Sequence, residues 1–514
     1  MAMTTEEPVL DGTTPLALVA TASDTVGATA VAHPVASEGE VPADVGVSRD
    51  DLAAAGFRGE VGDTLVLPGH PAVRVLYGTG DPVALDRARL RDAAAAAARA
   101  AAAHDRLSLL LPGLLAPGDE AQAATEGALL ARYRYGMKHD VAGPVLAFLT
   151  VVVPEGGSAL DAARDGARRG ATFAQATAMA RDLANAPPGR LTATRLAELA
   201  QALAADPDRR LEVEVFDKAQ LQELGCGGLL GVNAGSVEEP RMVKLTYRAD
   251  VADPGPDGDG DGPARLALVG KGIMYDSGGI SLKPSDAVHA TMKNDMSGAG
   301  AILAAMAQLA ALGCGSDVTG WLMCTDNMPS GSALKLGDVI TIRGGTTVEV
   351  MNTDAEGRLV MADALVLATE ATGDDRPHAL VDIATLTGAC LRALGPEVAG
   401  VFGTDGDLVG QVQAAAAATD EPVWELPVDR RYRRYLDTPI ADMKNLGGEH
   451  AGAITAALFL AEFVGDTPWA HIDIAGPAQN DKDASWRPAG CTGFGARLLL
   501  ELALDFRPPA GNPA

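Results

Sequence analysis

Three charged residues stand close together directly after a short apolar run in the C-terminal half of the chain. Asp354, Glu356 and Arg358 lie in MNTDAEGRL, which follows the β-branched run TTVEV. Carboxylates placed where a buried strand should end are costly to remove from water unless something cationic meets them. The pattern therefore predicts that another part of the chain supplies or holds a cation at this point.

A second group of charges lies in LVGKGIMYDSGGISLKPSDAVHATMKNDM, where Lys271, Asp276, Lys283 and Asp295 alternate in sign. With the two earlier acids this makes four carboxylates and two amines, and spacing alone leaves a network of structural salt bridges open. Four carboxylates also neutralise two divalent cations, and oxygen ligands without cysteine or histidine suit magnesium, manganese or zinc. A lysine could join such a site only as a neutral amine, which nearby dications would enforce.

The surrounding elements predict how these residues meet. From about residue 210, short apolar runs such as LALVG, VTGWLMCT and ALVDIATLTG alternate with helical stretches such as AGAILAAMAQLAALG. This alternation is typical of an α/β fold with a mostly parallel central sheet flanked by helices. Ligand sites in such sheets lie beyond the carboxyl ends of the strands. Lys271 follows LALVG, the acids follow TVEVMNT and Thr385 follows LVDIA, so we expect all of them at one edge of that sheet.

The chain is long enough for two domains. Short β-like runs and the alanine-rich stretch RDAAAAAARAAAAHDR predict a smaller N-terminal α/β domain over residues 1–170. The Pro-Pro break in RDLANAPPGRLTATRLAELAQALA indicates a linker helix over 171–190. Residues 191–514 then form the larger C-terminal catalytic domain.

Composition limits the partners and the compartment. The 514 residues include 41 basic and 68 acidic side chains, a net charge of −27 that disfavours nucleic acids and anionic membrane surfaces. We find neither an apolar run long enough to span a bilayer nor a secretory signal at the N-terminus, which predicts a cytoplasmic protein. The five cysteines are odd in number and widely spaced, so they predict buried apolar residues rather than disulfides or zinc ligands.

Two motifs carry a resemblance to a known family. NTDAEGRL together with GKGIMYDSGGISLKP resembles the signature pair of the leucyl aminopeptidase (cytosol aminopeptidase) family, and DNMPSGSALKLGDVI and VDIATLTGAC follow in the family's order. The likeness is patchy before residue 120 and close to continuous after 265. It implies a metal-dependent aminopeptidase that releases N-terminal residues, leucine and similar ones preferred, from peptides with a free N-terminus. It also implies a homohexamer built as a dimer of trimers.

The resemblance implies a role for each acidic residue of the motifs. Asp276 and Glu356 would bridge two divalent metal ions, manganese or zinc. Asp354 would bind the more exchangeable ion, and Lys271 and Asp295 the tighter one. A water bridging the two ions would attack the peptide carbonyl.

Further roles follow from the same resemblance. Lys283 would polarise the peptide carbonyl, and Arg358 would hold a bicarbonate ion that acts as general base on the bridging water. The substrate-binding residues implied in this way are Met292, Thr385, Leu386 and Gly388. In one departure from the family pattern, the segment between Lys283 and Asp295 carries one extra residue.

Other functions compete for the same residues. A two-metal phosphoesterase could use these carboxylates, but such sites usually add histidines, and a DNA-binding regulatory role would need a basic groove. Ser277 lacks the G-x-S-x-G elbow of a serine hydrolase. The acidic loop 253–264 imitates a calcium loop, but Leu268 stands where its twelfth position requires glutamate. The basic stretch DRRYRRY, 429–435, is typical of a solvated helix face.

Overall fold

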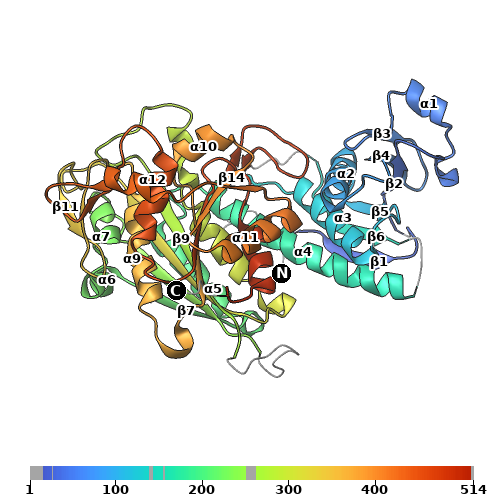
Figure 1. Ribbon diagram of the computed structural model, residues 1–514. Helices are drawn as coiled ribbons and strands as arrows, with labels where there is room; N and C mark the ends of the chain where they lie inside the picture. Colours follow the sequence, from blue (N-terminus) through green and yellow to red (C-terminus); the bar gives the residue numbers. More distant parts are fainter. Residues whose placement is uncertain (1–15, 26, 138–142, 154–156, 251–261, 511–514) are drawn as a thin grey trace. The chain divides into compact units, whose positions relative to one another are not determined.

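The computed structural model describes residues 16–25, 27–137, 143–153, 157–250 and 262–510, and its contacts divide them into two units (Figure 1). One unit holds the described residues up to Ala178 together with Asn480–Gly490, and the other holds Met179–Gln479 and the residues from Cys491 on. The change of unit falls inside helix α4, Ser158–Asn185. The domain limits expected from the sequence stay a prediction. The sequence analysis did not predict that residues 480–490 belong to the first unit.

The first unit contains a six-stranded sheet in the order β1-β6-β5-β2-β4-β3, parallel except for the β3–β4 pair. Alanines of α2 and α3 pack against it, since small side chains let the two helices approach the strands and each other closely. The strands are β1 Leu18–Ala22, β2 Ala30–Ala36, β3 Thr64–Leu67, β4 Val73–Gly80, β5 Arg106–Leu110 and β6 Phe148–Val152. The helices are α1 Arg49–Ala54, α2 Arg87–Ala100 and α3 Pro117–Ala131.

The second unit contains an eight-stranded sheet in the order β15-β14-β17-β13-β9-β10-β8-β7. Its four central strands, β17, β13, β9 and β10, are parallel, and antiparallel pairs join β8 and β7 at one side and β14 at the other. This confirms the α/β prediction with a parallel-rich central sheet. The strands are β7 Leu211–Phe216, β8 Arg241–Tyr247, β9 Arg265–Asp276, β10 Asp317–Asn327, β13 Ala379–Ala384, β14 Ala399–Gly403, β15 Val423–Glu425 and β17 Trp469–Asp473.

Helices cover both faces of this sheet because alternate residues of its buried strands are apolar on both sides. On β9, Gly270 faces α8 so closely that a Cβ there would lie 2.8 Å from Ala299, while Val269 and Ile273 join the core built with α7, α9 and α12 on the opposite face. The helices are α5 Ala193–Ala204, α6 Lys218–Leu224, α7 Gly227–Asn233, α8 Ser297–Met306, α9 Gly357–Thr369, α10 Gly388–Leu394, α11 Gly406–Thr419, α12 Gly452–Ala461 and α13 Ala496–Asp505.

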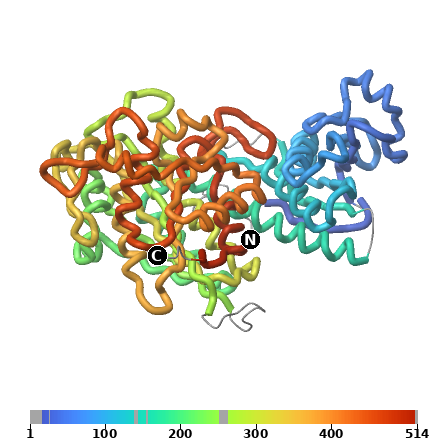
Figure 2. The backbone as a smooth tube through the Cα atoms, in the orientation of Figure 1, coloured from blue at the N-terminus to red at the C-terminus, as the bar shows by residue number. Residues whose placement is uncertain are grey.

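Segments far apart in sequence meet in this unit: α8 contacts the C-terminal helix α13, and Figure 2 shows the red C-terminal end of the chain beside green and yellow segments. Three short strands complete it: β11 Val339–Thr341, β12 Thr347–Glu349 and β16 Met443–Lys444. Two more, β18 Gln479–Asn480 and β19 Gly490–Cys491, lie where the chain changes unit. All five cysteines lie in the described residues and are buried without disulfides. Among the described helices, none has the length and apolar sequence that a membrane span requires.

Candidate metal centre

A β-bulge places two of the predicted ligands on one side of the sheet. Lys271 and Asp276 lie five residues apart on β9, and strict alternation would put them on opposite faces. The pairing of β9 with β10 shifts by one residue at Met274, between Thr325 and Asp326 of β10. The extra residue reverses the alternation, so Asp276 turns to the side of Lys271.

The second pair of acids reaches the same place from another sheet. The expectation that TTVEV belongs to the central sheet is wrong: β12 pairs with β11 and β16 in a separate three-stranded sheet. The strand is only three residues long and follows a Gly-Gly turn from β11, so it forms a hairpin instead. The chain then runs through Asp354 to Glu356, the residue at the N-terminal end of α9.

Three carboxylates converge at this point. Asp276, Asp354 and Glu356 each offer an oxygen atom, and these atoms lie within 4.8 Å of one another. Glu356 is 2% exposed, and its Oε2 has no hydrogen-bond partner among the described residues. A buried, unpaired carboxylate oxygen is costly without a cation, so the donor set fits a divalent metal ion.

Lys271 holds the buried end of the site together. Its Nζ lies 2.8 Å from Asp295 Oδ2 and 2.8 Å from Glu356 Oε1, and it donates to the carbonyl oxygen of Thr385 at 3.1 Å. Burial opposes the charge of Lys271, but Asp295 and Glu356 outweigh it and raise the lysine pKa. Burial raises the pKa of Asp295. Without metal, Lys271 is therefore an ammonium ion at the position where a cation balances these acids.

Lys283 plays the same part at the more open end. Its Nζ lies 2.9 Å from Asp276 Oδ2 and 2.5 Å from Asp354 Oδ1. Burial is again opposed by the carboxylates, chiefly Asp276, and the net effect raises the pKa of Lys283. The side chains of Lys283 and Asp354 keep 17% and 32% of their surface exposed, so a substrate could reach this end.

Neighbouring amides orient the ligands, and the sequence patterns did not single them out. Asp276 Oδ1 accepts hydrogen bonds from the Gly278 N–H at 2.9 Å and from Asn327 Nδ2 at 2.8 Å. Asn327 also donates to the carbonyl oxygen of Thr353 at 2.9 Å, which ties the acidic loop to the end of β10. The position of Asn327 at the end of the strand beside β9 is a signal that could have identified it.

Arg358 lies beside the carboxylates in the first turn of α9. It is 5% exposed, and its Nη1 donates to the carbonyl oxygen of Asn445 at 3.0 Å. Its Nε has no hydrogen-bond partner in the part of the chain that the structure describes. Burial lowers the Arg358 pKa to about 10, so the guanidinium stays charged at neutral pH and could bind an anion.

The predicted substrate-binding residues lie on two segments. Thr385 and Leu386 lie in the turn between β13 and α10, and Gly388 is the first residue of α10. Thr385 Oγ1 donates to Asp295 Oδ1 at 2.6 Å. Met292 lies in the 3₁₀ turn that leads into Asp295. In spite of the extra residue in this segment, Asp295 reaches Lys271.

The neighbouring Asn294 points elsewhere. It donates to Gln479 Oε1 at 2.7 Å.

The residues considered for other functions make ordinary structural contacts where the structure describes them. The Ser277 hydroxyl is buried and donates to the carbonyl oxygen of Asn327 at 2.7 Å. In the basic stretch, Arg431 is ion-paired with Asp429, and Arg433 lies 3.0 Å from Asp437. The calcium-like residues 257, 259 and 261 lie outside the described residues.

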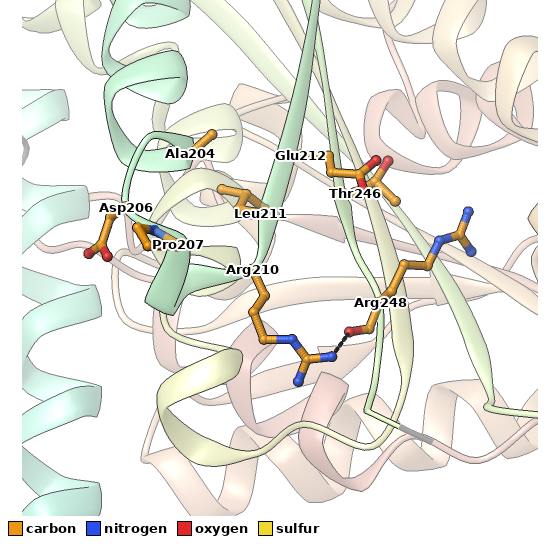
Figure 3. A pocket seen from close by; sticks show the side chains of 8 residues that line it. All are labelled: Ala204, Asp206, Pro207, Arg210, Leu211, Glu212, Thr246 and Arg248. Atoms are coloured by element: carbon orange, nitrogen blue, oxygen red, sulfur yellow. Dashed lines mark hydrogen bonds between the residues drawn. The ribbon is translucent and has the colours of Figure 1, made fainter. Parts of the chain in front are cut away.

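A surface hollow at the end of α5 contains none of the predicted site residues. Figure 3 shows its lining, in which Arg210 donates to the carbonyl oxygen of Arg248 at 2.9 Å. Both arginines are neutralised: Arg210 lies 3.3 Å from Asp250, and Arg248 lies 3.0 Å from Asp317. The hollow therefore offers no arginine without a carboxylate partner.

Comparisons with known proteins agree with this geometry. The model of the cytosol aminopeptidase family's catalytic domain matches residues 178–500, and that of its N-terminal domain matches 45–138. A probable cytosol aminopeptidase of Roseiflexus castenholzii is 42% identical over 471 residues, 89% of this chain and 93% of the relative.

Two solved structures are similar over almost their whole length. The bottromycin maturation enzyme BotP in complex with Mn is 37% identical with a TM-score of 0.82, covering 93% of this chain and 99% of BotP. A tomato leucine aminopeptidase mutant is 28% identical with a TM-score of 0.83, covering 95% and 97%. Since family models match both parts of the chain and a relative matches over most of its length, the chain belongs to the cytosol aminopeptidase family and is an aminopeptidase, a hydrolase of peptides.

Proposed function

We propose that the chain is a two-metal aminopeptidase that prefers leucine and similar residues at the free N-terminus of its peptide substrates. The observation that carries the proposal is the convergence of Asp276, Asp354 and Glu356 around an unpaired buried carboxylate oxygen. The manganese complex of BotP, a similar protein, supports a divalent metal as cofactor. When bound, two such ions, manganese or zinc, would activate water and polarise the peptide carbonyl.

The proposed ligands divide between two metal positions. Asp276 and Glu356 would hold both ions, as the family resemblance implies, and they offer oxygen atoms that lie within 4.8 Å of each other. Asp354, the most exposed of the acids, would hold the exchangeable ion. Lys271 and Asp295 would hold the buried one, after Lys271 has given up its proton to become a neutral amine.

Two cationic side chains would act on the substrate. Lys283 Nζ now contacts Asp276 and Asp354, and it would turn to donate to the carbonyl oxygen of the scissile peptide and stabilise its developing negative charge. Arg358 would hold bicarbonate through its unpaired Nε, and the bicarbonate would take the proton of the attacking water. This supplies a general base at a site whose described motif residues include no histidine.

The turn after β13 would bind the substrate. Thr385 and Leu386, with Met292, would line the pocket for the first side chain of the peptide, and Gly388 would leave room for its backbone. We include two wider properties in the proposal, a cytoplasmic location and a homohexamer built as a dimer of trimers. The homohexamer rests on the family resemblance, and the location rests on the sequence-based prediction above.

The test is hydrolysis of Leu-p-nitroanilide by the full chain after chelation, with manganese, zinc, cobalt and magnesium restored separately, each with and without bicarbonate. We expect activity to vanish with the chelator, to return with metal and to rise with bicarbonate. Glu356→Gln should lose nearly all activity, because it removes the charge of a central ligand. Glu370→Gln is the matched control, since Glu370 ends the same helix and pairs with Arg343 on the surface.

The outcomes separate the alternatives. Full activity of Glu356→Gln would contradict the proposed site. Metal binding without peptide hydrolysis, together with cleavage of p-nitrophenyl phosphate, would favour a phosphoesterase. A gel shift with DNA at low salt would favour the regulatory role.

A further inference from the structure

A buried group of charged residues lies on β13, the strand next to β9, and on β17, the strand beyond it, and the proposed mechanism does not use this group. Asp382 of β13 and His471 and Asp473 of β17 are all 0% exposed. Asp382 pairs in register with both His471 and Val269, so it lies on the face of the sheet that packs against α9. Since His471 and Asp473 are two residues apart, Asp473 shares this face at the carboxyl end of the strand.

Asp473 binds the turn between β13 and α10 through both carboxylate oxygens. Its Oδ2 accepts from Thr387 Oγ1 at 2.6 Å. Its Oδ1 accepts from the backbone N–H groups of Leu386 at 3.2 Å, Thr387 at 3.3 Å and Ala475 at 3.1 Å. An asparagine could accept on one side only, since its NH₂ group would face the Thr387 hydroxyl, which would then have to accept a hydrogen bond instead of donating one.

The same turn contacts the proposed metal ligands on its other side. The Thr385 carbonyl oxygen accepts from Lys271 Nζ at 3.1 Å, and Thr385 Oγ1 donates to Asp295 Oδ1 at 2.6 Å. Thr385 is therefore held two residues away from the contacts that Asp473 makes with Thr387. A shift of the turn would therefore move Lys271 and Asp295, the two residues proposed to hold the buried metal ion.

The charge of Asp473 is balanced inside the protein. Burial lowers the pKa of Arg358, and the charges of Glu356 and Asp473 oppose this, so Asp473 lies close enough to the guanidinium to interact with it. On the other side lies His471, whose Nδ1 is 2.5 Å from Asp382 Oδ1, while Trp469 Nε1 donates to Asp382 Oδ2 at 2.7 Å. Asp473 therefore has four hydrogen-bond donors around it as well as charged neighbours.

We propose that Asp473 is a positioning residue of the metal centre, which fixes the Thr385–Gly388 turn so that Thr385 orients Lys271 and Asp295. The inference rests on the proposed role of Asp295 as a metal ligand. Residues that orient metal ligands typically contribute about 10- to 100-fold to metal affinity. We therefore expect Asp473 to act on metal binding without touching the metal.

The experiment measures Mn²⁺ binding to the chelated full-length chain by isothermal titration calorimetry. Asp473→Asn and Thr387→Val break the shared contact from its two sides, and each should weaken binding about 10- to 100-fold. Thr387→Ser keeps the hydroxyl and should bind within about twofold of wild type.

Each disrupting variant has a control of the same chemistry. Thr387 also caps α10 by accepting from the Cys390 N–H at 3.0 Å, so Thr192→Val, at the N-cap of α5, controls for the loss of a cap alone. Asp363→Asn controls for Asp473, since Asp363 is a fully buried acid that accepts backbone N–H groups of Leu229 and Arg343. Both controls should lower the melting temperature and leave the Mn²⁺ affinity unchanged.

The outcomes are distinct. Wild-type Mn²⁺ affinity in folded Thr387→Val and Asp473→Asn would overturn the inference, and Thr387→Val decides alone if Asp473→Asn does not fold. Equal losses in the two control variants would also overturn it, because the effect would then be general destabilisation. Asp295→Asn tests the underlying ligand role: if it binds Mn²⁺ like wild type, the proposed site fails, whereas loss in Asp295→Asn alone refutes only the role of Asp473.

Discussion

Gly357→Ala is the substitution that should separate activity from stability most clearly. Gly357 is the first residue of α9 and follows Glu356. A Cβ at this position would lie 2.5 Å from Cε and 2.8 Å from Nζ of Lys271. Since ordinary contacts of a Cβ begin at 3.4 Å, the lysine must withdraw by about 0.9 Å, the difference between 3.4 and 2.5 Å.

The withdrawal should cost function more than stability. The end of a lysine can move, but this one is 3% exposed and contacts Asp295, Glu356 and the Thr385 carbonyl. A misplacement of about 1 Å in an active site can lower the rate about 100-fold. The protein should fold, because overpacking typically costs only about 1–3 kcal/mol.

The assay compares kcat/KM on Leu-p-nitroanilide with manganese and the free energy of unfolding in urea. We expect kcat/KM to fall about 100-fold, equivalent to about 2.7 kcal/mol. Gly406→Ala is the matched control, since Gly406 is the first residue of α11 and no atom lies within 4 Å of its Cβ position. It should keep full activity and gain about 0.4–1 kcal/mol of stability. Wild-type kcat/KM in folded Gly357→Ala would refute the reasoning that Lys271 must stay in place.

Three further predictions concern stability. Chelation should lower the melting temperature, and Mn²⁺ at about 100 times its dissociation constant should restore about 2.7 kcal/mol, as scanning calorimetry would measure; no shift would contradict a metal site in the native state. Burial opposes the charge of His471, but Asp382 raises its pKa above the ordinary 6.5, so its stabilisation is complete below pH 6.5 and is lost as pH rises through the higher folded value. The difference in unfolding free energy between the metal-free wild type and His471→Gln should therefore shrink from pH 6 to pH 9, and a growing difference would contradict this sign. Glu126→Ala should lower the free energy of unfolding in urea by about 3–5 kcal/mol, because it leaves the buried charge of Arg91 without its carboxylate partner. Arg91 Nε lies 2.8 Å from Glu126, and both side chains are 1% exposed. An unchanged urea midpoint would contradict this prediction and would mean that water solvates the arginine in the variant.

Much of the site could be predicted because its chemistry is carried by short motifs. The alternation of acids and lysines around Lys271 and Asp276 indicated a charge-matched cluster, and the structure brings these residues together with Asp354 and Glu356. The strand-helix alternation predicted the parallel-rich sheet, because buried parallel strands need apolar runs on both faces. The roles of the individual ligands stay predictions.

Other features depend on partners that are distant in sequence. The sheet to which β12 belongs was mispredicted, since a three-residue strand is placed by the hairpin and by β16, almost one hundred residues away. Asn445, whose Oδ1 accepts from Met351 N–H at 2.8 Å, supports the acidic loop from a segment that lies far away in sequence. Such contacts follow from the packing of the whole unit and leave no local pattern.

By itself the sequence determined which side chains could bind metal, the fold class and the family resemblance, because residue type and spacing are local properties. Only the tertiary structure decided that the bulge at Met274 turns Asp276 toward Lys271 and that Asp473 holds the turn beside Asp295. The reason is physical: the direction of a side chain depends on strand register, and a buried carboxylate is stable only where donors from several segments meet around it.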